Sequence, residues 1–358
     1  MKIEEKVVIK NKTSHRMKHT PRRLAWVCEN EKGGEDMEQA FPLEKIFPMK
    51  IREAFSGREW QEGLEEIRVR IGQPMEFVYD SKNQYPSIEG GACTFVEGCF
   101  AGKENHELYR MTMQDISEML SYISNYSLYA YKEEMKQGYI TIEGGHRIGL
   151  AGGAVMEQGK IMGLHHVAFL NIRVAHQKQG CATEVLSYIR QKNSIYNTLL
   201  LSEPGAGKTT LLRDCIRQLS DGDCAKQGMK VAVLDERSEI AACHLGIPQN
   251  DLGMRTDVLD GCDKTEGMRM LLRTMSPQII AVDELGAEAD FMAVEQAVYS
   301  GCKVLGTIHA GDVRELFEKP YLSEWVKREV FQRYIWIKRE ADGNRKTMVY
   351  DARMERLC

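Results

Sequence analysis

A run of small residues followed by a lysine and two threonines stands in the segment NTLLLSEPGAGKTTLLRD, residues 197–214. Its apolar start is typical of a strand and its end of a helix, so the glycines fall in a tight strand-to-helix loop. In such a loop, backbone N–H groups point at phosphate oxygens and the helix N-terminus adds positive potential. Lys208 is then placed to reach the β- and γ-phosphates of a nucleotide, and the Thr209 hydroxyl to bind Mg²⁺.

The segment departs from the full phosphate-loop pattern at one position. Ser202 stands six residues before the lysine, where the pattern has glycine, whereas the stretch from Pro204 to Thr209 is intact. An ordinary turn with a chance Gly-Lys-Thr is the alternative, and the strand–loop–helix context disfavours it. We therefore predict a nucleotide-binding loop formed by Ser202, Glu203, Pro204, Gly205, Ala206, Gly207, Lys208, Thr209 and Thr210.

Two carboxylates follow a second apolar run, IIAVDELG, about 75 residues beyond the lysine. At the carboxyl end of a strand, Asp283 would hold Mg²⁺ through water, and Glu284 would orient or deprotonate the attacking water. An acidic pair after a strand is by itself often only a turn. Together with the loop, it predicts a P-loop enzyme that hydrolyses ATP, with ATP and Mg²⁺ as cofactors. No Asn-Lys-x-Asp motif for reading guanine is present, which favours ATP.

Two further strand ends carry polar side chains. VAVLDERSEI ends a strand in Asp235 and Glu236, and KVLGTIHAGD ends another in Thr307 and His309. Such residues can sense a γ-phosphate or position water, because parallel strands bring their carboxyl ends to one edge. For His309, a histidine without a catalytic role at the sheet edge is an equally weighted alternative.

The patterning divides the chain into three parts. Residues 1–40 form a basic extension, with a charge of +6 over residues 1–23. We expect it to be disordered and solvated, the alternative being an arm for anionic lipid or nucleic acid. Within residues 41–178, the runs 65–78 and 139–174 alternate with period two, and this part of the chain predicts an α+β domain with antiparallel pairs. Its turn signals are the Gly-Gly pairs at 144–145 and 152–153 and Gln158-Gly159, and its clearest helix is 112–130, with Thr112 as N-cap.

Residues 179–358 alternate apolar runs with helical segments. This order predicts an α/β fold, a RecA-like P-loop ATPase domain whose mainly parallel sheet is covered on both faces. The predicted strands are 198–201, 230–234, 278–282, 303–308 and 334–337, and the predicted helices are 209–219, 265–275, 289–299 and 313 onward.

Composition sets limits on the function. The chain has 358 residues, 43% hydrophobic and 28% charged, and a net charge of −4, as in ordinary globular proteins. The net charge argues against a broad basic groove for nucleic acid. No apolar stretch is long enough to predict a transmembrane helix. The ten cysteines form no Cys-x-x-Cys pair, so we expect free thiols and no zinc site.

Residues 41–340 resemble the stage III sporulation protein AA family, which is related to the ATPases of type II and type IV secretion and of pilus machines. The marks of this resemblance are EEIRVRIGQP, EGGHRIGLAG, SEPGAGKTTLLRD, VLDERSEIA, MRTDVLDGCDKTEGM and VDELG. Those relatives have an acidic box after the strand that follows the P-loop helix, and Asp235 and Glu236 stand at that place in this chain. They also have a histidine box that ends in Thr-x-His, which Thr307-Ile308-His309 matches. The relatives often have glycine where this chain has Asp283, so the metal site would be closer to that of a general P-loop enzyme.

The resemblance implies a ring ATPase, usually a hexamer, with nucleotide between its two domains and arginines on the phosphates. Of the candidate arginines we favour Arg255, because it lies in a polar loop, MRTDVLDGCDKTEG, that could order on nucleotide. The other candidates are Arg68, Arg70, Arg147, Arg173, Arg237, Arg269 and Arg273. Each could instead be a surface ion pair.

The resemblance also implies partners and a location. The expected partners are further copies of this chain and membrane proteins of a sporulation secretion-like complex between mother cell and forespore. The chain would be cytoplasmic, recruited peripherally to the membrane on the mother-cell side, with no direct membrane insertion and no stable nucleic acid. A nucleic-acid-dependent NTPase and a nucleotide-bound, non-catalytic scaffold are the alternative functions.

Overall fold

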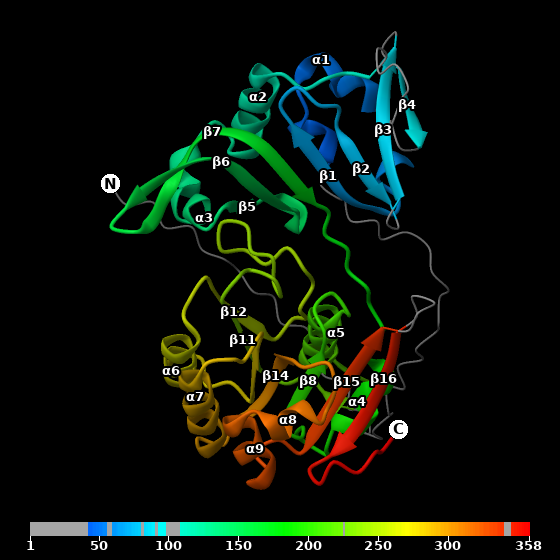
Figure 1. Cartoon of the computed structure of the whole chain (residues 1–358). Coiled ribbons are helices and arrows are strands. Elements are labelled where there is room, and N and C mark those ends of the chain that lie inside the picture. The colour runs from blue at the N-terminus through cyan, green and yellow to red at the C-terminus, as the bar shows by residue number, and fades with distance from the viewer. Residues whose placement is uncertain are drawn as a thin grey trace, which may run out of the picture. The chain divides into compact units, whose positions relative to one another are not determined.

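Two seven-stranded sheets organise the chain in the computed structural model (Figure 1). The structure describes residues 42–55, 59–79, 82–89, 92–97, 108–224, 226–339 and 345–358, so the predicted basic extension, 1–40, lies outside the described residues. Ala40–Cys358 form one compact unit.

The first sheet has the strand order β4-β3-β2-β1-β7-β6-β5, and every neighbouring pair is antiparallel. Ile67 and Val69 of β1 alternate with more exposed neighbours and are fully buried in one core, and a register shift between Leu64 and Glu66 brings Leu64 into the same core. The strands are β1 (Leu64–Arg70), β2 (Glu76–Tyr79), β3 (Lys82–Glu89), β4 (Ala92–Glu97), β5 (Tyr139–Thr141), β6 (Arg147–Glu157) and β7 (Lys160–Arg173). The helices of this part are α1 (Met49–Arg52), α2 (Met113–Ile123) and α3 (Lys132–Lys136).

Helix α2 begins where the sequence predicts and ends earlier. Thr112 is its N-cap, and the Thr112 and Asp115 side chains form a reciprocal capping box. The predicted helix to residue 130 is wrong because Asn125 and Tyr126 take left-handed φ values of 47° and 60°, which end the helix.

The predicted turn at Gly152–Gly153 is also wrong. Both glycines lie inside β6, at a register shift between Ala151 and Gly153. A Cβ at Gly152 would stand 2.6 Å from the carbonyl oxygen of His166 on β7, so the two backbones approach too closely for a side chain. The glycine pair therefore marks a β-bulge in a long hairpin rather than its turn.

The second sheet has the order β12-β11-β13-β14-β8-β15-β16. All its pairs are parallel except β15 with β16, so it is a mixed sheet with an antiparallel edge. The strands are β8 (Thr198–Ser202), β11 (Val231–Asp235), β12 (Thr256–Asp260), β13 (Ile279–Val282), β14 (Lys303–His309), β15 (Arg333–Arg339) and β16 (Arg345–Asp351). A two-residue pair, β9 (Gly222–Asp223) with β10 (Lys226–Gln227), lies apart from it.

Helices cover both faces of this sheet (Figure 1). Leu200 and Val233 point into the core under α4 and α5, whereas Leu199 and Leu234 point into the core under α6 and α7. Central strands buried on both faces need near-continuous apolar sequence, which is why the strands were predictable. The helices are α4 (Thr183–Ile189), α5 (Lys208–Asp221), α6 (Lys264–Thr274), α7 (Glu288–Tyr299), α8 (Glu315–Glu318) and α9 (Pro320–Lys327).

One segment predicted as a polar loop forms regular structure instead. Thr256–Asp260 is the edge strand β12, and α6 begins at Lys264 with Asp263 as its N-cap. The strand was hidden because its side chains are only partly buried at the sheet edge, so polar residues are tolerated there.

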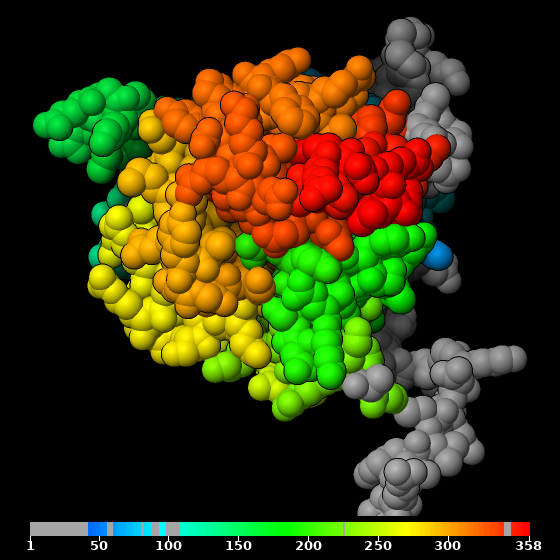
Figure 2. All heavy atoms as spheres, turned by 90° about the horizontal axis from the view of Figure 1, so that it is seen from below, coloured from blue at the N-terminus to red at the C-terminus, as the bar shows by residue number. Residues whose placement is uncertain are grey.

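The C-terminal strands pack beside the segment that carries α4. The view from below shows the red end of the chain next to the green segment (Figure 2). The Arg333 side chain donates to the carbonyl oxygen of Tyr188 at 2.9 Å, and β15 pairs in parallel with β8. Within the described residues, no helix combines the length and the apolar character that crossing a membrane requires.

Buried His146 makes stability depend on pH. Burial lowers the pKa of its imidazole from 6.5 to about 4. The neutral ring is therefore favoured in the fold, so stability is full above pH 6.5 and is lost as pH falls toward 4. We expect His146→Gln to remove about 3 kcal/mol of this pH-dependent change, as measured by urea denaturation between those pH values. If the free energies of unfolding of wild type and variant differ by the same amount at both ends of this pH range, the assignment is contradicted. The control is His165→Gln, which changes an exposed histidine.

Candidate active site

The predicted phosphate loop joins β8 to α5, as its sequence indicates. Gly205 and Gly207 have φ values of +76° and +100°, which only glycine adopts without strain. Gly207 is the N-cap of α5, so the loop leads directly into the helix N-terminus. Ser202, at the position where the pattern has glycine, is fully buried at the end of β8. The loop geometry is thus formed without the missing glycine.

Lys208 lies in the centre of the site. Its ammonium donates to His309 Nδ1 at 2.9 Å and lies 3.4 Å from both oxygens of Ser202. Burial lowers the pKa of the Lys208 amine, while the charges of Asp283 and Glu284 act to raise it. Because an ammonium has only N–H donors, His309 Nδ1 must accept, which places the ring proton on Nε2.

Asp283 lies beside the threonine of the loop. Thr209 Oγ1 is 3.3 Å from Asp283 Oδ2, and Thr307 donates to the other carboxylate oxygen. Hydroxyl and carboxylate oxygens are the hard ligands that Mg²⁺ prefers. Among the described residues, no group of three or more His, Cys, Asp or Glu is placed to hold a metal by itself. The pair suits a cation that takes its remaining ligands from phosphates and water.

Glu284 is held by two cationic or donor groups. His309 Nε2 donates to its Oε1 at 2.8 Å, and Arg237 pairs with its Oε2 at 2.7 Å. Burial acts to raise the pKa of Glu284, but His309, Arg237 and Lys208 together bring it below its ordinary value. The residue has a left-handed φ of 46°, a strained conformation of the kind that concentrates at functional sites. Lys208, His309, Glu284 and Arg237 thus form one continuous chain of polar contacts.

Asp235 and Glu236 make contacts of another kind. The Asp235 carboxylate is 1% exposed and accepts from the backbone N–H groups of Glu239, Ile240 and Ala241 at 2.8–2.9 Å. Burial raises its pKa to about 6. Glu236 pairs with Lys264 at the start of α6. The Asp235 contacts hold residues 239–241, the Glu236 pair joins the end of β11 to α6, and neither set reaches Lys208 or Glu284.

The structure does not bring Arg255 to this cluster. Arg255 directly precedes β12, whereas the cluster lies at the carboxyl ends of β8, β13 and β14. Since the strands are parallel, Arg255 and the cluster lie at opposite ends of the strands. Among the other candidate arginines, Arg237 reaches the cluster, and Arg147 pairs with Glu239 at 3.1 Å.

Sequence reasoning missed Arg345. A Cβ placed on Gly207 would stand 2.6 Å from the Arg345 guanidinium carbon, so this side chain lies against the phosphate loop. Arg345 also lines a cavity of about 350 Å³ together with Gly207, Lys178 and Tyr188. No local signal marks it, because β16 is far from the loop in sequence and reaches it only through the order of the strands.

Comparison with solved structures finds proteins of similar fold. The fold matches the ATPase DotB of Yersinia pseudotuberculosis with a TM-score of 0.54, at 14% identity, over 86% of this chain and 81% of that one. It matches the pilus retraction motor PilT, solved with bound ADP, with a TM-score of 0.52, at 15% identity, over 82% and 80%. At such identities the likeness concerns the fold alone.

Sequence comparison then gives the family. Residues 37–357 match the family model for sporulation stage III protein AA, and the chain belongs to this family. The stage III sporulation protein AA of Bacillus subtilis (strain 168) is 38% identical over 312 residues, which are 86% of this chain and 94% of that protein. The resemblance stated from the motifs is confirmed.

The contacts of Asp235 predict a variant with a local effect. We expect Asp235→Ala to expose the amides of residues 239–241 to hydrogen exchange at least about tenfold faster, because each loses a hydrogen bond to a buried carboxylate. Hydrogen–deuterium exchange resolved to that segment measures this. Glu236→Ala is the matched control and should leave exchange there unchanged. Equal protection in Asp235→Ala and wild type would contradict the interpretation.

Proposed function

We propose that this protein is a P-loop ATPase with a RecA-like catalytic part, which binds ATP with Mg²⁺ at the loop 202–210 and hydrolyses it. The observation that carries the proposal is the convergence of Lys208, Thr209, Asp283, Glu284 and His309 at one sheet edge. Lys208 and Thr209 begin α5 directly after the loop, whereas Asp283, Glu284 and His309 lie at or directly after the ends of β13 and β14. Ligands of open α/β sheets bind at this edge.

Phosphate binding follows from the loop. The backbone N–H groups at the start of α5 would receive the phosphate oxygens, and Lys208 would move from His309 to the β- and γ-phosphates. Arg345, lying against Gly207, would add a second cation from β16. Thr209 and Asp283 would hold Mg²⁺, which when bound neutralises charge that develops on the phosphates.

Glu284 is proposed to position the attacking water. A carboxylate with a lowered pKa is ionised at neutral pH, so it accepts a hydrogen bond from water well but is a weak general base. Arg237 and His309 fix the orientation of this carboxylate from two sides. We therefore assign Glu284 an orienting role and His309 a positioning role, with the Nε2 proton directed at Glu284.

The biological role is proposed from family and fold. DotB and PilT are named as an ATPase and a pilus retraction motor, and this chain shares their fold. We propose that it works as a homo-oligomeric ring, a hexamer, that assembles or drives a membrane-associated sporulation complex between mother cell and forespore. It would be cytoplasmic and would reach the membrane through partner proteins. The division of the chain at residue 178 into two domains remains part of this proposal.

Two substitutions test catalysis. We expect Lys208→Ala to lower ATP turnover at least about 100-fold, because the phosphates lose their central cation. Glu284→Gln should bind ATP with near wild-type affinity and lower turnover by a similar factor, since it removes only the water-orienting carboxylate. Phosphate release and equilibrium binding of a fluorescent ATP analogue measure both.

The control is Glu324→Gln, an exposed residue of α9, which should turn over ATP like wild type. Wild-type turnover in Glu284→Gln would contradict the assignment of Glu284. Tight ATP binding by wild type with no turnover, alone or beside membranes of sporulating cells, would favour the scaffold function instead.

Arg345 gives a second prediction for the same site. We expect Arg345→Ala to weaken binding of the ATP analogue about tenfold, the usual effect of losing one charge-assisted hydrogen bond. Arg353→Ala, in the turn after β16, removes the same charge from an exposed position and should not change the affinity. Equal affinities for Arg345→Ala and wild type would exclude Arg345 from nucleotide binding.

A further inference from the structure

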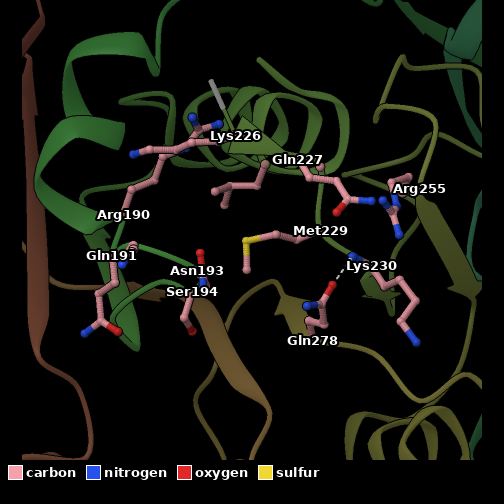
Figure 3. Close-up of a pocket in the computed structure, with 13 residues that line it drawn as sticks. Arg190, Gln191, Asn193, Ser194, Lys226, Gln227, Met229, Lys230, Arg255 and Gln278 are labelled. Atoms are coloured by element: carbon pink, nitrogen blue, oxygen red, sulfur yellow. Dashed lines mark hydrogen bonds between the residues drawn. The ribbon is translucent and has the colours of Figure 1, made fainter. Parts of the chain in front are cut away.

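Four segments that each lead into a parallel strand surround a cavity of about 530 Å³ (Figure 3). They are residues 190–194 before β8, residues 226–230 before β11, Arg255 before β12, and Gln278 before β13, and Leu219 of α5 completes the lining. Because these strands are parallel, the cavity lies at the end of the sheet where the strands begin, which we call its amino edge. It is therefore separate from the candidate active site, at the carboxyl edge.

The cavity is lined by cations and by no carboxylate. Of its thirteen lining residues, those with charge are Arg190, Lys192, Lys226, Lys230 and Arg255. Arg190 pairs with Asp223 at 2.7 Å. Within the described part of the chain, the other four form no ion pair. This excess of positive charge stands in a chain whose net charge is −4, so composition does not explain it.

The walls of the cavity are fixed by backbone contacts. The Arg255 N–H donates to Ser220 Oγ at 2.7 Å, and its carbonyl accepts from Val231 at 3.0 Å. The Lys230 N–H donates to Gln278 Oε1 at 2.9 Å, the contact dashed in Figure 3. In this view Arg190 and Lys226 lie on one side, Lys230 and Arg255 lie on the other, and the end of the Lys230 side chain extends away from the other three.

We propose that this cavity binds a compact oligophosphate, a small molecule that carries three or more phosphate charges. Four cations that form no ion pair line one cavity, although its three lysines are exposed, and a multivalent anion would supply them with a shared counter-charge. The volume lies within the range of small-molecule sites, about 300–1,000 Å³. Side chains of Gln191, Asn193, Ser194, Gln227 and Gln278 add hydrogen-bonding groups.

The lining also indicates which ligands are disfavoured. No aromatic side chain lines the cavity, so a nucleobase would find no stacking partner and the phosphates must supply most of the recognition. A nucleic acid strand would need a basic track that continues past a cavity of this size, in a chain of net negative charge. A small phosphate-rich ligand therefore fits better than a nucleic acid.

Isothermal titration calorimetry with inorganic tripolyphosphate tests the proposal. The full chain carrying Lys208→Ala is used, so that the phosphate loop is disabled and a failure of the proposed ATPase function leaves this test intact. We expect saturable binding of one tripolyphosphate per chain, weakened at least about tenfold by Lys230→Gln with Arg255→Gln, and weakened by added salt.

The control Lys327→Gln removes a positive charge from the last turn of α9 and should leave the affinity for tripolyphosphate unchanged. Circular dichroism checks that each variant is folded, and Lys226→Gln replaces any variant that is not. Absence of binding in the Lys208→Ala chain overturns the proposal, as does equal weakening by Lys327→Gln. Tighter binding of a single-stranded oligonucleotide than of tripolyphosphate, lost in the same variants, overturns it in favour of nucleic acid.

Discussion

Parallel pairing of β11, β13, β14 and β8 is the constraint on which the candidate site depends. In this register, His309 at the end of β14 lies opposite Ser202 at the end of β8. Asp283 and Glu284 follow directly after β13, beside β14. Residues more than 100 positions apart in sequence therefore meet without any local signal that joins them. A shift of one residue in a strand would turn its side chains to the opposite face and separate these groups.

The polar chain from Lys208 to Arg237 offsets the unfavourable burial of its charges. Lys208 and Asp283 are both less than a tenth exposed, and each has a hydrogen-bond partner within the site. Removing one partner from such a network leaves a buried charge uncompensated, which is more unfavourable than leaving the whole network in place. The same network keeps Glu284 ionised and holds its strained backbone. The contacts that compensate the buried charges are therefore also the contacts that hold Glu284 in position for chemistry.

Structural features that a local sequence pattern determines could be predicted, whereas features that depend on contacts between distant segments could not. The buried strands and the phosphate loop were predictable because each needs a continuous apolar run or closely spaced glycines. β12 was missed because an edge strand tolerates polar residues, and the Gly152–Gly153 bulge because a glycine pair has the same appearance in a turn. Arg345 reaches Gly207 only because β16 is the last strand of the sheet, an order that no local pattern contains. Arg255, which the sequence analysis favoured, does not reach the cluster because it directly precedes β12 and so lies at the opposite end of the parallel strands.

Helix α5 connects the two edges of the sheet, and its dipole acts oppositely at its two ends. Its N-terminus, at Lys208, favours anions, and its C-terminal carbonyls favour cations. Arg190 uses this second end, since its guanidinium donates to the carbonyl oxygen of Gln218 at 2.7 Å. The dipole therefore accounts for one cation of the amino-edge cavity, together with Asp223. It does not account for Lys192, Lys226, Lys230 and Arg255, whose side chains form no ion pair among the described residues. Lys226 meets a carboxylate only through its backbone N–H, which donates to Asp223 at 2.8 Å. An anion from outside the chain would supply the counter-charge that these four side chains lack.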